Sequence, residues 1–175
     1  MILSLFRKST AAEPVYTAYA AIVAQSRQPR FYAEWGVPDT VTGRFDMISL
    51  HLALLLRRLR NEGAGAKEFS QALFDLFFKD MDRSLRQMGA GDLAVPKKIQ
   101  KMADLFYGLL ANLDTALATE SAAEVEGVLA RNVYGDVAGS GAALLAHYII
   151  AESKRLADVP ASEIMAGRLT MGHAA

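Results

Sequence analysis

Apolar residues recur at helical spacing along most of this chain, and no segment shows the alternation of apolar and polar residues that marks a β-strand. An amphipathic helix has to bury its apolar stripe, so several such helices in succession pack around a shared core. The pattern therefore predicts an all-α fold, a single compact bundle of about six helices. The predicted helices span residues 11–27, 45–61, 67–88, 96–117, 121–134 and 140–156.

One of these helices has almost no polar side. Between residues 45 and 61, Leu52 and Leu55 belong to one apolar stripe, while Met47 and Leu50 cover much of the opposite side. Such a helix belongs either in the centre of a bundle or under a binding partner.

The chain is long enough for one well-filled core. It has 175 residues, of which 52% are hydrophobic, and a chain of about 150 residues buries roughly 70% of its unfolded surface. We expect a single domain over residues 1–175, with its core at about 31–158. Residues 1–9 and 159–175 are expected to be loose termini, apart from one short helical turn at 162–167.

Composition excludes several classes of function. The 19 basic and 19 acidic residues cancel, so no overall field attracts the chain to nucleic acid or to an anionic membrane. The absence of cysteine excludes disulfides, thiolate metal sites and cysteine nucleophiles. No apolar run approaches the ~20 residues that span a bilayer, and the N-terminal run ends at Arg7, too early for a signal-peptide core of about 7–15 residues. We expect a cytoplasmic protein, soluble or peripheral at the inner face of the membrane.

The best candidates for metal-dependent catalysis are Asp75, Asp80 and Asp82, which lie on one predicted helix. At 100° per residue, Asp80 points about 140° away from Asp75, so the three carboxylates do not converge. Ion pairs with Lys79 and Arg86, each at i,i+4, account for Asp75 and Asp82. The sequence also lacks nucleophile motifs, phosphate-binding loops and paired histidines. We therefore predict no catalytic residue, metal, cofactor or small-molecule substrate.

Asp80 faces the apolar side of its helix, where an ionised carboxylate needs a basic partner. Arg44, His51, Arg57 and Arg58 are the candidates, and we select Asp80 and Arg57 as the structural ion pair. His51 lies at the edge of an apolar stripe, where a lone histidine is more often a hydrogen-bonded structural residue than a base or a ligand.

Lys97, Lys98 and Lys101 open a predicted helix, where each cation opposes the helix dipole at a cost of about 0.3–1 kcal/mol. Two explanations stay open. Either Asp92 and Asp104 neutralise the lysines, or the lysines contact a phosphate backbone or an acidic partner. Aromatic residues at nucleic-acid-binding spacing are absent, so recognition of a specific nucleic-acid sequence is not expected.

Residues 31–118 contain an ordered series of short motifs. The most specific are GVPDTVTGRFD at 36–46 and DMDRSLRQMGAGDLAVPKK at 80–98, and the others are FY at 31–32, LH at 50–51, RRL at 57–59 and FYG at 106–108. In this order they resemble the ubiquinol-cytochrome c chaperone family of mitochondria and alphaproteobacteria. The resemblance implies a chaperone, not an enzyme, that helps assemble the cytochrome bc1 complex (complex III) by binding newly made cytochrome b. Mitochondrial relatives work with a small partner subunit at the ribosomal tunnel exit, and a bacterial relative need not use either.

A chaperone for a membrane subunit needs an exposed apolar patch larger than the few hundred Å2 usual for a monomer. The leucines and the methionine of the helix at 45–61 suit this task, because flexible side chains adapt to varied segments. The candidate partner-binding residues are Phe31, Tyr32, Trp35, Asp39, Arg44, Phe45, His51, Arg58, Lys97 and Lys98.

Two other functions compete with this one. One is a peripheral membrane scaffold anchored through Ile2, Leu3, Leu5 and Phe6, with Arg7 and Lys8 at the lipid headgroups, or a general membrane-protein assembly factor with another client. A metal-dependent enzyme would use the three aspartates of residues 75–82 together with His51.

Overall fold

The computed structural model describes the backbone of residues 3–137 and 141–172, and the side chains of residues 13–137 and 141–172. Within these ranges the regular secondary structure consists of eight α-helices, with no strand, so the predicted all-α class is confirmed. The helices are α1 (Leu3–Ser26), α2 (Pro29–Ala33), α3 (Val41–Leu59), α4 (Ala64–Gln87), α5 (Val95–Ala118), α6 (Ala122–Asn132), α7 (Ala142–Ala157) and α8 (Ala161–Met165). The six longer helices correspond to those predicted from the sequence, and α8 lies at the predicted short turn.

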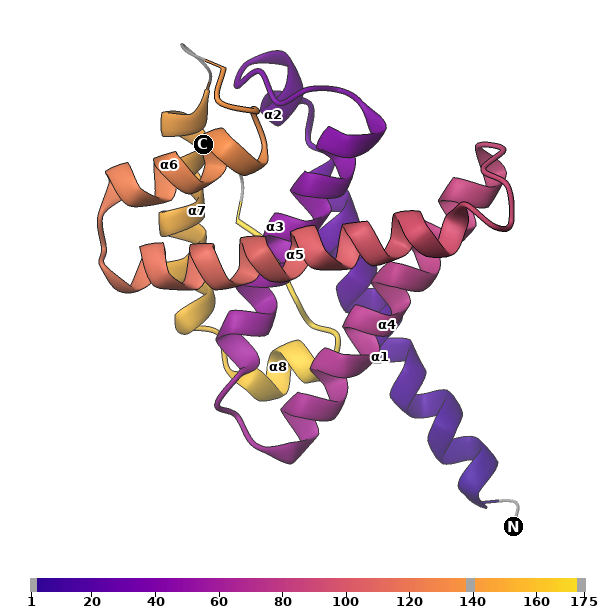
Figure 1. Ribbon diagram of the computed structural model, residues 1–175. Coiled ribbons are helices and arrows are strands. Elements are labelled where there is room, and N and C mark those ends of the chain that lie inside the picture. The colour runs from indigo at the N-terminus through magenta and orange to yellow at the C-terminus, as the bar shows by residue number, and fades with distance from the viewer. Residues whose placement is uncertain (1–2, 138–140, 173–175) are drawn as a thin grey trace.

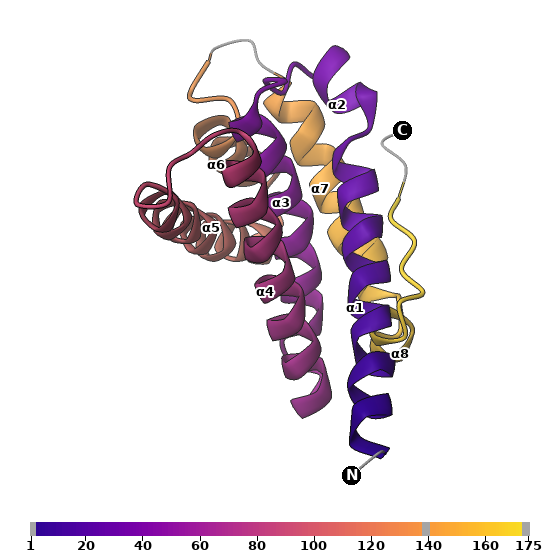
Figure 2. The same cartoon turned by 90° about the vertical axis from the view of Figure 1, so that its right-hand side faces the viewer.

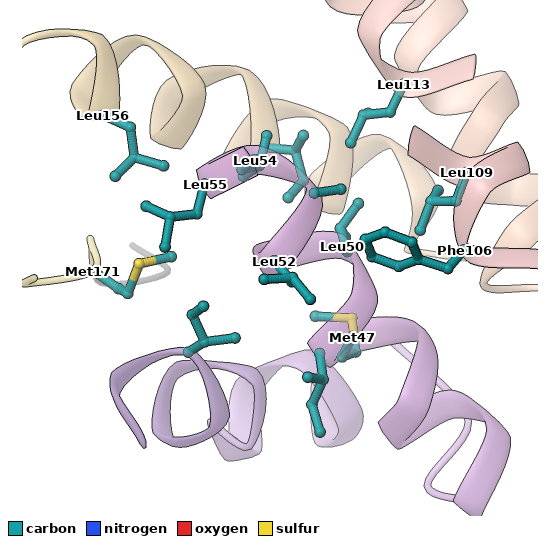
Figure 3. Packing of buried hydrophobic residues seen from close by; sticks show 14 of the residues in the cluster. Met47, Leu50, Leu52, Leu54, Leu55, Phe106, Leu109, Leu113, Leu156 and Met171 are labelled. Carbon is teal, nitrogen blue, oxygen red and sulfur yellow. The ribbon is translucent and has the colours of Figure 1, made fainter. Parts of the chain in front are cut away.

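Helix α3 runs through the middle of the bundle. It contacts α1 and α7 on one side and α4 and α5 on the other, an arrangement that Figure 2 shows from the side. Twelve of its nineteen residues are buried. In the close view of Figure 3, Leu50 lies toward Phe106 of α5, while Leu55 lies toward Leu156 of α7 and Met171 of the C-terminal segment. Of the two positions predicted for this helix, the structure shows the central one.

Local signals in the sequence set several helix ends. Thr40 caps α3, because its Oγ1 accepts a hydrogen bond from the backbone N–H of Gly43 at 3.1 Å. Helix α4 ends before Gly89, whose positive φ of 85° lets the N–H of Ala90 bond back to the carbonyl of Leu85 at 3.0 Å. Helix α1 begins at Leu3 rather than at residue 11 and continues through Pro14.

The C-terminal segment packs against the bundle. Ile164, Leu169 and Met171 are buried, and the carbonyl of Gly172 accepts a hydrogen bond from Gln25 at 2.5 Å. The expectation of a loose terminus is therefore wrong for residues 159–172, because irregularly spaced apolar side chains fill the space beside α1 and α7. Residues 173–175 lie outside the described part, and the backbone of residues 3–9 belongs to α1.

The start of α3 predicts which glycine substitution the fold does not tolerate. A Cβ atom on Gly43 would lie 1.9 Å from the carbonyl oxygen of Pro38, whereas Gly108, inside the exposed face of α5, has open space around it. We expect Gly43→Ala to lower the free energy of unfolding by about 2–4 kcal/mol. Gly108→Ala should raise it by about 0.5–1 kcal/mol, because alanine restricts the unfolded chain. Urea unfolding of both variants checks this, and equal stabilities would contradict it.

Candidate functional site

Four of the predicted partner-binding residues lie in the core. Phe31, Trp35, Phe45 and His51 are buried, so the prediction that they form a binding surface is wrong. The rings of Phe31 and Trp35 are 5.3 Å apart at their centroids, and Phe45 stacks on Phe77 at 5.5 Å. The dense aromatic residues that suggested a partner instead fill the junction between α2, α3, α4 and α7. Apart from the half-buried Leu56, the leucines and the methionine of α3 are likewise buried in the core.

His51 belongs to a buried hydrogen-bond network. Its Nδ1 lies 2.7 Å from the carbonyl oxygen of Met47, which can only accept, so this nitrogen carries the proton. Nε2 then accepts from the hydroxyl of Tyr148 at 3.0 Å, and that hydroxyl receives a further bond from Gln25 at 2.8 Å. Burial lowers the pKa of His51 to about 4, because the charged ring cannot be solvated there. The geometry is that of a neutral structural residue.

Four further candidates, Asp39, Arg44, Tyr32 and Arg58, make local contacts. Asp39 and Arg44 form an exposed ion pair at 2.8 Å. The half-buried Tyr32 donates its hydroxyl to the carbonyl of Ser26 at 2.8 Å. Arg58 donates to two carbonyl oxygens at the end of α7, those of Leu156 at 3.0 Å and Val159 at 2.9 Å, and so joins α3 to the start of the C-terminal segment.

The predicted ion pair between Asp80 and Arg57 is replaced by two other interactions. Asp80 accepts a hydrogen bond from the hydroxyl of Tyr19 at 2.9 Å, and Arg57 binds Asp114 at 2.9 Å. Because a tyrosine hydroxyl satisfies the half-buried carboxylate, a basic partner is not needed. The same bond helps to raise the pKa of Tyr19, although burial of the ring has the larger effect.

The aspartates of α4 make separate contacts. Asp82 pairs with Arg86 at 2.7 Å, as predicted, and Asp75 accepts a hydrogen bond from Gln71 at 2.8 Å. Among the residues that the structure describes, no group of three or more acidic or histidine side chains could hold a metal ion.

A groove of about 850 Å3 lies between α3, α4 and α5. Figure 1 shows α4 and α5 diverging from the turn that joins them, with the C-terminal part of α3 between their far ends. The lining consists of the last residues of α3, the first half of α4 and the second half of α5. The lining residues are Leu56, Arg57, Leu59, Arg60, Lys67, Ser70, Gln71, Phe74, Phe106, Tyr107, Leu110, Ala111, Asp114 and Thr115.

The groove combines an aromatic floor with a charged rim. The ring of Phe74 lies 5.6 Å from those of Phe106 and Tyr107, and Tyr107 is 55% exposed. On the rim, Asp114 binds Arg57 at 2.9 Å and Arg60 at 2.8 Å. The bonds from these guanidinium groups, first that of Arg60, hold the pKa of Asp114 below its usual range. An exposed apolar floor edged by fixed charges can hold an apolar segment in one orientation.

Sequence reasoning did not predict this groove. The FYG motif at residues 106–108 contains two of its aromatic residues, but in the sequence this motif indicated only a family resemblance. In the structure Phe106 is buried, while the neighbouring Tyr107 is exposed in the groove.

The chain is thus an all-α bundle with an open groove between α3, α4 and α5. None of the helices in the described part of the chain combines the length and the hydropathy that a membrane span requires. The sequence model of the ubiquinol-cytochrome C chaperone family matches residues 33–171, and the chain belongs to this family.

Individual proteins are also similar to this chain in structure or in sequence. The crystal structure of the Cbp3 homolog from Brucella abortus is similar, with a TM-score of 0.88, 37% sequence identity, and coverage of 99% of this chain and 98% of that one. The ubiquinol-cytochrome-c reductase complex assembly factor 1 of Xenopus laevis is 21% identical over 58% of this chain, and that of Homo sapiens is 22% identical over the same share. The matched segments are 51% and 34% of those two proteins, so the match spans about half the length of the first and about a third of the second.

The carboxyl group of Asp46, on α3, should make the stability of the protein depend on pH. Burial raises the pKa of this carboxyl from 3.8 to about 7. Between these values the folded protein binds a proton that the unfolded chain releases, so this group reduces stability as the pH rises. Asp46→Asn removes the effect, and we expect its gain in unfolding free energy to be about 2 kcal/mol larger at pH 8 than at pH 5. Urea unfolding at both values tests this, with the exposed Asp75→Asn as the control; parallel pH profiles for Asp46→Asn and the wild type would contradict it.

Proposed function

We propose that this protein is an assembly factor for the cytochrome bc1 complex that binds newly synthesised cytochrome b before it joins the other subunits. Membership of the ubiquinol-cytochrome C chaperone family supports the assembly role, and the named relatives are assembly factors of the same complex. The single observation that carries client binding is the groove between α3, α4 and α5. In this proposal the protein acts by binding and not by catalysis.

The groove suits a helical apolar segment. A helix that docks in a groove places apolar side chains at i, i+3, i+4 and i+7 on the floor, which here offers Phe74, Tyr107 and Leu110. Arg57, Arg60 and Lys67 outnumber Asp114 on the lining, so the rim favours a segment flanked by anionic groups. An unassembled membrane subunit presents such segments, because its apolar helices have not yet met their partners.

The proposed client, cytochrome b, is a membrane subunit, and this indicates where the protein acts. We infer that the protein works in the cytoplasm at the inner face of the membrane, where a membrane subunit is inserted. A small partner subunit and the ribosome surface are further partners that the family resemblance implies. The exposed Lys97 and Lys98 and the exposed pair of Asp39 and Arg44 stay candidates for contact with them.

Removal of the protein tests the assembly role. We expect reduced-minus-oxidised haem spectra of membranes from the source bacterium to lose cytochrome b selectively when the protein is deleted, and to regain it with the intact chain. Unchanged cytochrome b, under conditions that require the bc1 complex, would show that the protein serves another client.

A matched pair of tyrosines tests the groove directly. Tyr107 in the groove and Tyr16 on α1 are both 55% exposed, so a photo-reactive aromatic residue at either position is equally accessible. We expect cross-linking to newly made cytochrome b from position 107 and not from position 16. Equal cross-linking from both positions, or none from position 107, would contradict docking in the groove.

A charge placed in the groove should block its function. Leu110→Asp puts a carboxylate on the apolar lining, whereas Leu144→Asp puts one on an exposed leucine of α7 outside it. We expect only the first variant to reproduce the loss of cytochrome b seen on deletion. Thermal unfolding of both purified variants separates a lost binding site from a lost fold.

A further inference from the structure

The turn between α4 and α5 presents two large apolar side chains to solvent. Leu93 is 91% exposed, more than any other large hydrophobic residue in the described part of the chain, and Met88 is 52% exposed. Figures 1 and 2 both show this turn projecting from the bundle, at the end of the molecule away from the N-terminal end of α1. It is thus separate from the N-terminal segment that the sequence suggested as an anchor.

The backbone of this turn is held in place. The N–H of Ala94 bonds to the carbonyl of Gly91 at 2.8 Å, and the N–H of Val95 bonds to the same carbonyl at 3.1 Å. The side chain of Val95 is completely buried and fixes the end of the turn to the bundle. The exposure of Leu93 is therefore a property of the folded structure, because its neighbours on both sides are fixed.

Three lysines follow the apolar turn. Lys97, Lys98 and Lys101 are exposed, and none of them makes an ion pair within the described residues. The aspartates that were candidates to neutralise them have other partners: Asp92 binds Arg86 at 2.5 Å, and Asp104 accepts from Gln100 at 3.0 Å. The lysines also oppose the dipole of α5, so helix stability does not explain them.

We propose that the α4–α5 turn and the start of α5 form a docking surface for an anionic phospholipid bilayer. Leu93 and Met88 enter the interface, and the lysines contact the lipid phosphates. Apolar side chains beside a cluster of unpaired lysines complement such a bilayer in both hydrophobicity and charge. A nucleic acid would use the lysines but not Leu93, and residues 88–101 contain no aromatic side chain on which a base could stack.

Vesicle flotation of the intact chain tests this surface. We expect binding to phosphatidylcholine vesicles that contain phosphatidylglycerol, and little binding to phosphatidylcholine alone. The variant Lys97→Ser/Lys98→Ser/Lys101→Ser should weaken partitioning by about tenfold or more, and Leu93→Ser should also weaken it. The matched controls are Lys79→Ser/Arg131→Ser/Lys154→Ser, which removes three exposed cations elsewhere, and Leu144→Ser. Both controls should float as the wild type does.

A fluorescent label tests insertion of the turn. Because the chain has no cysteine, Leu93→Cys can carry a single environment-sensitive dye, with Leu144→Cys as the control. Anionic vesicles should shift the emission to the blue only at position 93. The proposal is overturned if the intact chain does not float, or if the lysine variant floats as well as the wild type. It is also overturned if the lysines bind an RNA oligomer while vesicles leave the dye unchanged.

The vesicle and dye experiments are carried out without cytochrome b. Failure of the docking surface would therefore leave the groove untouched as a client site, and failure of the groove would leave the docking surface standing.

Discussion

The burial of most of α3, twelve of its nineteen residues, is the constraint on which the rest of the structure depends. A helix with apolar side chains around its whole circumference is stable in water only when other elements cover every face. Here α1 and α7 cover one side and α4 and α5 the other, while the C-terminal segment covers Leu55 through Met171. The short α2 and the C-terminal segment are thus parts of the core, because without them some faces of α3 would meet water.

The sequence predicted the helices well because their signals are local. The apolar stripes depend only on residues close in the chain, and the six longer helices that they predict are all present, although α1 begins eight residues earlier than expected. Partners in space were predicted poorly. Asp80 was expected to need an arginine, yet Tyr19, 61 positions earlier in the chain, satisfies it. An apolar stripe predicts that a helix packs against something and does not identify what it packs against.

The candidate site shows the same limit more strongly. Phe31, Trp35 and Phe45 were predicted to lie on a partner-binding surface, yet all three are buried. Phe31 and Trp35 reach the core because α2 returns their segment to the bundle, and Phe45 reaches it from α3. The groove could not be predicted, since it exists only through the angle at which α4 and α5 diverge. That angle depends on how their side chains pack on α3, and no short motif encodes it.

Helix α5 connects the α4–α5 turn to the groove, and its length sets the distance between the two surfaces. At a rise of 1.5 Å per residue, the twelve positions from Lys98 to Leu110 span about 18 Å. A polypeptide reaching from lipid headgroups at one end to the aromatic floor at the other would need about five or six extended residues. The spacing would sort clients by the length of the polar loop beside their apolar segments, independently of the sequence of the segment itself.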